Sequence, residues 1–144
     1  MLERSRILNC HYLHFVWSTR QRAPLLVDSL EKAVYSYIVR VCEDDGCELL
    51  AIGGMSDHVH LLVNFSNTCT VAAFVQHVKG GSSRLINKTL APDANFAWQK
   101  GYAVFSIRKG DIGATRAYIL DQKNRHSNRR VWSSLEALCP DDDV

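Results

Sequence analysis

The stretch HVHLLVNF, residues 58–65, is the segment that decides the fold. Successive side chains of a β-strand point to opposite faces of the sheet, so every second residue shares a face. One face then carries His58, His60, Leu62 and Asn64, and the other carries Val59, Leu61, Val63 and Phe65. The stretch therefore predicts a strand with one apolar face and one face that presents two imidazoles.

The preceding segment supplies a partner for this strand. ELLAIGGM, residues 48–55, is a second short apolar run, and only Ser56 and Asp57 separate the two runs. Two strand-like runs joined by so short a connection are typical of a β-hairpin. We therefore expect these two strands to be neighbours in an antiparallel sheet.

The remaining segments complete a regular order of elements. Two more runs have the composition of strands, residues 10–19 and 102–107. Apolar residues recur at helical spacing in residues 29–43, 70–86 and 111–120. Thr70 is a candidate N-cap, and Gly80 and Gly81 either weaken the second helix or allow a close backbone approach to phosphate. The order predicts an α+β, ferredoxin-like antiparallel sheet with helices packed on one face.

Length and composition limit the kind of protein. A chain of 144 residues, 47% hydrophobic, suits one domain spanning residues 1–144, with an acidic tail at 140–144 that we expect to be disordered. No apolar run approaches the roughly 20 residues that span a bilayer, so we expect a cytoplasmic protein. The five cysteines include no C-x-x-C pair, which favours reduced and mostly buried thiols over a disulfide framework or a zinc site.

Charge is unevenly distributed along the chain. The net charge is only +2, but residues 79–130 contain eleven Lys or Arg against three Asp, while the rest of the chain is net negative. A basic surface attracts the phosphates of nucleic acids, although many charged segments are only solvated faces. The second half of the chain is therefore the candidate nucleic-acid surface.

The two histidines of the strand are candidate metal ligands. Residues i and i+2 of a strand lie roughly 6.6 Å apart, close enough for His58 and His60 to converge on one ion about 2.1 Å from each nitrogen. The alternative, two histidines with ordinary hydrogen bonds on a half-exposed strand, is about equally probable from the spacing alone. The spacing leaves both readings open.

The last helix adds a tyrosine and a glutamine. At 100° per residue, one narrow polar stripe contains Asp111, Thr115, Tyr118, Gln122 and Arg125. The apolar residues Ala114, Ala117 and Leu120 centre about 100° away, so Tyr118 is not on the apolar stripe. Residues i and i+4 lie about 5–6 Å apart on a helix, so Gln122 could enter the same site as Tyr118.

Five segments of the chain resemble a known family in order and spacing. They are FVWSTR (15–20), MSDHVHLLV (55–63), HVKGGSSRLIN (77–87), WQKGYAVFSI (98–107) and AYILDQKNRH (117–126). They resemble the successive blocks of the single-tyrosine HUH transposases, which include the TnpA-type enzymes of the smallest insertion sequences and the transposases associated with repetitive extragenic palindromes.

This resemblance implies a fold of the HUH endonuclease type and a specific chemistry. Tyr118 would be the nucleophile, and His58, His60 and Gln122 would hold a divalent metal, Mg²⁺ or Mn²⁺. The implied reaction cleaves and rejoins single-stranded DNA at hairpin-bearing ends of the element through a 5′-phosphotyrosine. A homodimer, in which the tyrosine of one subunit can complete the site of the other, is also implied, whereas the palindrome-associated relatives are expected to be monomers.

The same resemblance directs attention to DNA contacts. Candidate backbone contacts are Lys79, Arg84, Lys88, Arg108, Lys109, Arg125, Arg129 and Arg130. Trp98 or Tyr102 could stack on bases, although core packing suits both residues better. One departure concerns Arg125 and His126, because many relatives have two adjacent histidines at these positions.

Two other functions compete with this one. A histidine-triad hydrolase would need a third histidine at the position of Leu62, which excludes the usual form of that site. A domesticated, non-cutting DNA-binding protein of the same fold is the stronger alternative, because a fold does not determine an activity. The enzyme ranks first because every catalytic position of the family is occupied by a suitable residue.

Overall fold

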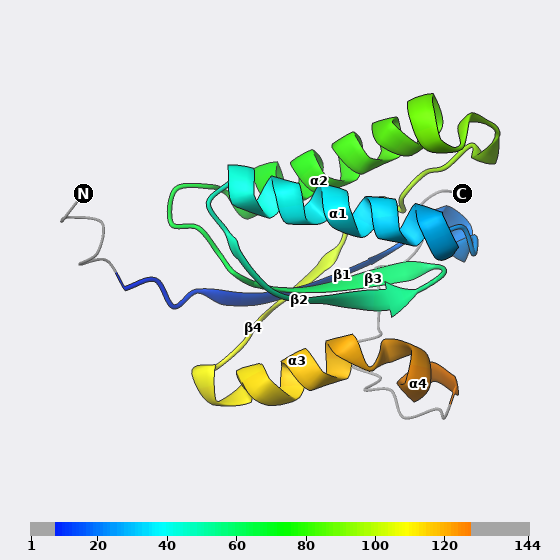
Figure 1. Cartoon of the computed structure of the whole chain (residues 1–144). Helices are drawn as coiled ribbons and strands as arrows, with labels where there is room; N and C mark the ends of the chain where they lie inside the picture. Colours follow the sequence, from blue (N-terminus) through cyan, green and yellow to red (C-terminus); the bar gives the residue numbers. More distant parts are fainter. Residues whose placement is uncertain (1–7, 128–144) are drawn as a thin grey trace.

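The computed structural model describes residues 8–127 of the chain (Figure 1). Its strands are β1 (Tyr12–Ser18), β2 (Glu48–Met55), β3 (His58–Asn64) and β4 (Ala103–Ser106). Its longer helices are α1 (Asp28–Asp44), α2 (Val71–Leu85), α3 (Ile112–Leu120) and α4 (Gln122–Ser127). Short helical turns are η2 (Arg20–Arg22), η3 (Ile86–Leu90), η4 (Pro92–Ala94) and η5 (Lys109–Asp111). The predicted acidic tail at 140–144 and Cys139 lie outside the described residues.

The four strands form one antiparallel sheet in the order β2-β3-β1-β4. The predicted hairpin is present, since Met55 pairs with His58 at its end. On the other side of β3, Val16 of β1 pairs with His60. This order, with α1 and α2 as the connections, is the ferredoxin-like arrangement that the sequence predicted.

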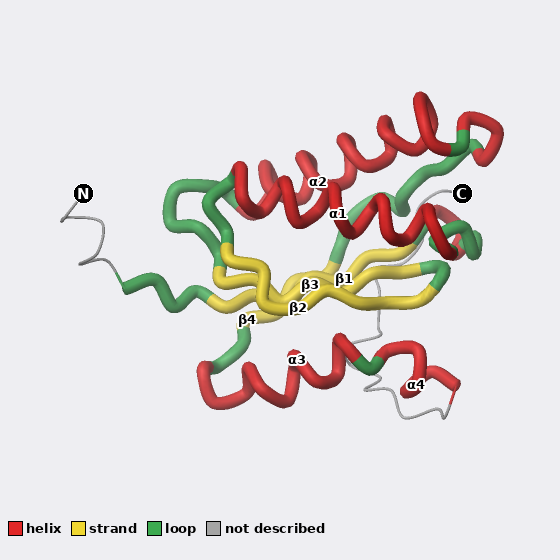
Figure 2. The backbone as a smooth tube through the Cα atoms, viewed as in Figure 1, coloured by secondary structure: helices red, strands yellow, loops and turns green. Residues whose placement is uncertain are grey.

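The helices lie on both faces of the sheet, not on one. Helices α1 and α2 cover one face, and α3 and α4 cover the other (Figures 1 and 2). The expectation of helices on one face is therefore wrong for the last part of the chain. By the time the chain leaves β4, the first face is already covered by α1 and α2, so the next helix covers the face that remains.

The alternation along β3 divides the interior into two parts. Val59, Leu61 and Val63 belong to the large core beneath α1 and α2. Leu62, on the opposite face, packs with Tyr118 and Ile119 of α3 in a small apolar cluster. The predicted alternation is thus confirmed, and the imidazole face of β3 is enclosed by α3 rather than open to solvent.

Helix α2 runs without interruption through its two glycines. The Thr70 side chain accepts a hydrogen bond from the Ala73 backbone N–H, so Thr70 is the N-cap, as predicted. A Cβ atom added to Gly81 would lie 1.7 Å from the Tyr37 hydroxyl of α1. The close approach that Gly81 permits is therefore between two helices, whereas approach to phosphate was one of two alternatives that the sequence left open.

Gly53 of β2 allows α3 to approach the sheet. A Cβ atom on Gly53 would lie 2.1 Å from the carbonyl oxygen of Ile119, a backbone atom that cannot move without displacing the helix. We expect Gly53→Ala to lower the free energy of unfolding by about 1–3 kcal/mol, the usual cost of overpacking. Urea denaturation of the full chain measures this effect.

Gly80→Ala is the matched control for this substitution. A Cβ atom at Gly80 would have no neighbour within 4 Å, and alanine is favoured over glycine inside a helix by roughly 0.5–1 kcal/mol. The control should therefore be neutral or stabilising. Equal stability of the Gly53→Ala and wild-type proteins would contradict the close contact between β2 and α3.

The cysteines within residues 8–127 are free thiols in different environments. Cys42 and Cys47 are buried, Cys69 is half-buried and Cys10 is exposed, and all four are free cysteines. Burial raises the pKa of the Cys42 thiol to about 12, which makes it a poor nucleophile. Over residues 8–127, no helix combines the length and the apolar character that a membrane span requires.

Candidate active site

Three histidines lie on the face of the sheet beneath α3. His58 and His60 project from β3 and His14 projects from β1, and all three side chains are buried. The rings of His58 and His60 are 5.1 Å apart between centroids, so the two imidazoles share a face as predicted. His14 Nε2 lies 2.9 Å from His60 Nδ1, within hydrogen-bond distance.

Asp57 holds the other side of the His58 ring. His58 Nδ1 donates to Asp57 Oδ1 at 2.7 Å, and Arg22 Nε donates to Asp57 Oδ2 at 3.1 Å. These partners, with the hydrogen bond to His58 foremost, lower the pKa of the Asp57 carboxyl to about 2. An ionised carboxylate on Nδ1 directs His58 Nε2 into the space beneath α3 and α4.

The polar stripe of the last helix faces the sheet. Thr115 and Tyr118 of α3 are buried, as is Gln122 at the start of α4, whereas Ala114, Ala117 and Leu120 are exposed. The buried side therefore carries the polar stripe together with Ile119, while the predicted apolar residues face solvent. The polar stripe is buried because it packs against the face of the sheet that carries the three imidazoles.

The tyrosine and the glutamine belong to two helices instead of one. Asp121 leaves the helical region at φ −103° and ψ 21°, which separates α3 from α4. Gln122 still lies close to Tyr118, because its Nε2 donates to the Tyr118 carbonyl oxygen at 3.2 Å. This hydrogen bond orients the Gln122 amide so that its oxygen faces the histidines.

Gln122 Oε1 lies between a histidine of β3 and a histidine of α4. It lies 3.3 Å from His58 Nε2 and 3.0 Å from His126 Nε2. The His126 ring is 4.9 Å from the His58 ring between centroids. Of these three side chains, His58 and Gln122 come from the predicted set, and His126 of α4 is an addition.

Tyr118 is fully buried between a histidine and an arginine. Its ring meets the His60 ring edge-to-face, with centroids 5.8 Å apart. The guanidinium carbon of Arg125 lies 5.0 Å from the centre of the same ring, a cation–π arrangement. The structure thus brings Tyr118, His60 and Arg125 together. The helical stripe predicted that Tyr118 and Arg125 share one side of the last helix, and the strand period predicted that His60 shares a face of its strand with His58.

The donor set fits a divalent metal ion. Two ligands bound at about 2.1 Å to one ion lie roughly 3.0–3.4 Å apart in octahedral or tetrahedral geometry, and His58 Nε2 and Gln122 Oε1 match this separation. Asp57 accepts from Nδ1 of His58, as carboxylates typically do for metal-binding histidines, and His14 Nε2 lies against Nδ1 of His60.

The amide is essential to this fit. Over residues 8–127, no three His, Cys, Asp or Glu side chains gather closely enough to hold a metal ion by themselves. A site built on His58 and His60 therefore depends on the Gln122 oxygen and on further donors. Phosphate oxygens of a bound nucleic acid are natural further donors for a hard cation.

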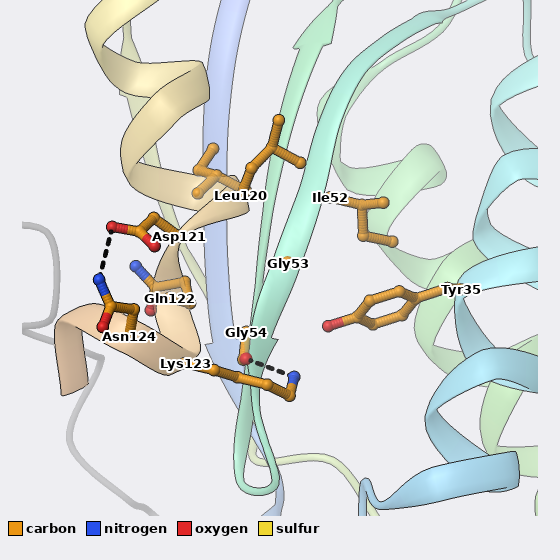
Figure 3. Close-up of a pocket in the computed structure, with 10 residues that line it drawn as sticks. Tyr35, Ile52, Gly53, Gly54, Leu120, Asp121, Gln122, Lys123 and Asn124 are labelled. Atoms are coloured by element: carbon orange, nitrogen blue, oxygen red, sulfur yellow. Dashed lines mark hydrogen bonds between the residues drawn. The ribbon is translucent and has the colours of Figure 1, made fainter. Parts of the chain in front are cut away.

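A cavity of about 330 Å³ lies beside Gln122, at the free edge of β2 (Figure 3). Strand β2 contributes Ile52, Gly53 and Gly54, α1 contributes Tyr35, and the α3–α4 segment closes the other side. Lys123 Nζ crosses the cavity edge, donating to the Gly54 carbonyl at 3.2 Å and to Glu31 at 2.8 Å. This lysine fastens α4 to both β2 and α1.

The predicted DNA-contacting residues lie on different sides of the sheet. Arg84 and Lys88 follow one another along α2 and η3, on the face away from Tyr118. Arg108 and Lys109 lie in the exposed connection between β4 and α3. Arg129 and Arg130 lie outside the described residues. Among the candidates within residues 8–127, the one with a described contact to Tyr118 is Arg125, and the DNA contacts stay predictions.

Two of the predicted contacts have structural roles. Lys79 Nζ donates to the carbonyl oxygens of Gln99 and Gly101, both at 2.7 Å, so it fastens the loop that precedes β4. Trp98 is buried and its indole N–H donates to the Ser82 hydroxyl at 2.9 Å. Core packing, the preferred role for Trp98, is confirmed, and Tyr102 is half-buried against the same core.

Sequence reasoning missed three members of the site. His14 became visible only with the pairing of β1 and β3, which the sequence does not give. Asp57 was assigned only to the turn before β3, although a carboxylate next to a candidate ligand was a signal. His126 lies four residues after Gln122, so the helical spacing that selected Gln122 could also have selected His126.

Fold and site together define a ferredoxin-like protein of the HUH endonuclease type. The family described as "Transposase IS200 like" matches residues 7–122, and the chain belongs to that family.

Relatives support this assignment. The chain is 27% identical over 107 residues to the transposase for insertion sequence element IS200 of Salmonella typhimurium, covering 70% of this chain and 69% of the relative. It is 23% identical over 118 residues to the ISDra2 transposase TnpA of Deinococcus radiodurans, covering 78% and 84%.

Two solved structures share the fold. A candidate transposase from Deinococcus radiodurans superposes with a TM-score of 0.64 at 24% identity, covering 81% of this chain and 94% of the other. A tyrosine transposase associated with REP sequences, solved with a REP hairpin, gives a TM-score of 0.65 at 17% identity, covering 86% and 72%.

Proposed function

We propose that this transposase cleaves and rejoins single-stranded DNA, with Tyr118 as nucleophile and with Mg²⁺ or Mn²⁺ held by His58, His60 and Gln122. The observation that carries the proposal is the junction between β3 and α3–α4. There, Gln122 Oε1 lies 3.3 Å from His58 Nε2, and the Tyr118 ring lies against His60. Burying polar groups costs folding free energy, and clusters of buried titratable groups are characteristic of functional sites.

Tyr118 would attack the scissile phosphorus in line with the leaving 3′ oxygen. The bond from the phenol oxygen to phosphorus forms as the bond to the 3′ oxygen breaks, which leaves a 5′-phosphotyrosine and a free 3′-hydroxyl. The number of phosphoester bonds is unchanged, so the 3′-hydroxyl of a second strand can reverse the step with new connectivity. No nucleotide triphosphate is needed for the exchange.

The site offers two forms of charge stabilisation. A bound divalent ion would act as a Lewis acid on the phosphate oxygens. A phenol has a reference pKa near 10, so its developing phenolate also needs nearby positive charge. The Arg125 guanidinium, 5.0 Å from the Tyr118 ring centre, supplies such a charge from the protein. Because Tyr118 is buried, DNA access requires side chains around it to move.

Hairpin-forming single strands are the proposed substrate. The REP-associated structural neighbour was solved with a hairpin, and the basic residues that follow position 79 supply charge for a DNA backbone. We place the protein with its DNA in the cytoplasm. A homodimer that exchanges Tyr118 between subunits stays a prediction.

The test is an assay for a covalent adduct. The full chain is incubated in Mn²⁺ or Mg²⁺ with single-stranded DNA carrying the hairpins that flank its own gene, labelled at either end, and run on a denaturing protein gel. A 3′-label should migrate with the protein, and a 5′-label should be released on a shorter fragment. A chelator should abolish both products.

The alternative function predicts a different result. A domesticated hairpin-binding protein would retard the same DNA on a native gel, with or without the chelator, and form no covalent adduct under any metal condition. Fully paired DNA of the same sequence is the substrate control. An adduct carrying the 5′-label instead of the 3′-label would overturn the proposed polarity.

A further inference from the structure

The outer edge of β2 lies beside the candidate active site. Strand β2 is the first in the order β2-β3-β1-β4, so within residues 8–127 no strand pairs with this edge. Two basic side chains reach it. Arg116 Nε donates to the Leu50 carbonyl oxygen at 3.0 Å, and Lys123 Nζ donates to the Gly54 carbonyl oxygen at 3.2 Å. Carbonyl groups of β2 therefore point outward here.

Ile52 adds a backbone donor and a backbone acceptor to the same edge. The backbone groups of a strand alternate between its two edges, so residues two apart direct their N–H and C=O groups to the same side. Ile52 and Gly54 lie opposite Leu61 and Val59 of β3 in one continuous register. The N–H and C=O of Ile52 therefore face outward, as the Gly54 carbonyl does, toward the cavity of about 330 Å³ that both residues line.

The walls of this cavity combine apolar and polar groups. Tyr35 of α1 lies on one side of the β2 edge, and Gln122 and Asn124 of α4 lie on the other (Figure 3). Leu120 adds aliphatic surface, and the exposed Asn124 amide adds a further donor and acceptor. A ligand would meet ring and aliphatic surface together with hydrogen-bonding groups. Proteins that recognise unpaired nucleobases use this combination.

Two other kinds of ligand suit the cavity less well. Lys123 is already paired with Glu31 at 2.8 Å and Asp121 adds a carboxylate to the lining, so the cavity does not favour a phosphate. The Lys123–Glu31 pair also joins α4 to α1 beside the edge, and a peptide added as a further strand would have to displace it. A single base needs only the short edge from Ile52 to Gly54.

We propose that this cavity holds one unpaired base of the single-stranded DNA, next to the scissile phosphate. The inference rests on the proposed function and deepens it. Gln122 connects the two sites, because it lines the cavity and its Oε1 lies 3.3 Å from His58 Nε2 in the proposed metal site. A base bound beside Gln122 fixes the register of the strand, and so selects the bond that is cut.

Three groups hold the base in this arrangement. The Ile52 backbone and the Asn124 amide hydrogen-bond to its edge, and Tyr35 contacts it from the side of α1. Asn124 is the side chain best suited to a test, since it is exposed and lies outside the proposed catalytic and metal-binding set. Asn124→Leu removes the amide and keeps a side chain of similar size.

The experiment measures the binding of single-stranded DNA from which one base is missing. Hairpin-bearing strands that flank the gene carry an abasic nucleotide at each unpaired position in turn, and fluorescence anisotropy with a chelator present gives the affinity of the full chain. We expect one position at which loss of the base weakens binding by about tenfold, within the range for one stacked base. That position should adjoin the bond cut in the covalent-adduct assay.

Variants and a crosslink locate the base. In Asn124→Leu, intact DNA should bind more weakly, and the abasic nucleotide should cost only about threefold, because part of the interaction is already lost. Asn67→Leu is the matched control, since Asn67 is an exposed asparagine in the connection between β3 and α2, and it should keep the tenfold effect. A 5-iodouracil at the sensitive position should crosslink to Tyr35 on irradiation.

Three results overturn the proposal. They are equal affinity for every abasic strand, a full tenfold effect retained by Asn124→Leu, and a crosslink that maps only outside the cavity. Failure of the proposed function gives a different result, because binding in the presence of a chelator requires no cleavage. Base-dependent binding without any covalent adduct would refute cleavage alone, and an adduct without base dependence would refute the base site alone.

Discussion

Phenylalanine in place of Tyr118 is expected to abolish the covalent protein–DNA adduct completely. The substitution removes only the hydroxyl, which is the proposed nucleophile. The ring that packs against His60 and lies beneath Arg125 is retained, so the fold and the metal site should survive. Because the proposed reaction uses the Tyr118 hydroxyl itself, we expect loss below detection instead of a partial decrease. Denaturing gels with 3′-labelled single-stranded DNA measure it.

Two comparisons make this result specific. Tyr12→Phe on β1 removes a hydroxyl from a tyrosine outside the site and should leave the adduct unchanged. Native gels should show that Tyr118→Phe still retards the hairpin DNA, since its basic residues are intact. An adduct formed by Tyr118→Phe at the wild-type rate would mean that a different side chain attacks the DNA.

Local sequence patterns predicted most of the fold. The alternation in residues 58–65 predicted the faces of β3, and Thr70 predicted the start of α2, because both depend on nearby residues alone. The face on which α3 lies depends on what the other helices have already covered. That information belongs to the assembled sheet, so the rule of helices on one face failed there.

The sequence predicted which side chains gather at the candidate site, but not what surrounds them. His58 and His60 share a face because of the strand period, which the sequence shows directly. The contact of His14 with His60 joins residues 46 positions apart, and it depends on the register of β1 against β3. Helical periodicity grouped Tyr118 with Gln122 correctly, but it gave no reason to expect the polar stripe to be buried.

Glutamine in place of His60 is expected to lower metal-dependent cleavage by at least about a hundredfold. His60 is the proposed ligand whose ring meets the Tyr118 ring, so its loss affects both the charge on the phosphate and the position of the nucleophile. Loss of comparable electrostatic groups costs other enzymes about 10²–10³ in rate. Single-turnover cleavage of labelled single-stranded DNA, measured across a range of Mn²⁺ concentrations, gives the effect.

His14→Gln is the informative companion, because His14 contacts His60 and is not itself a proposed ligand. A glutamine amide can reach toward His60 Nδ1 as His14 Nε2 does at 2.9 Å, so we expect a loss of about tenfold, the lower end for residues that orient a ligand. Excess Mn²⁺ should restore cleavage by His14→Gln, since only affinity is weakened, and should not restore His60→Gln, which lacks the ligand. Equal rescue of both variants would place His60 among the positioning residues and leave His58 and Gln122 as the ligands on which cleavage depends.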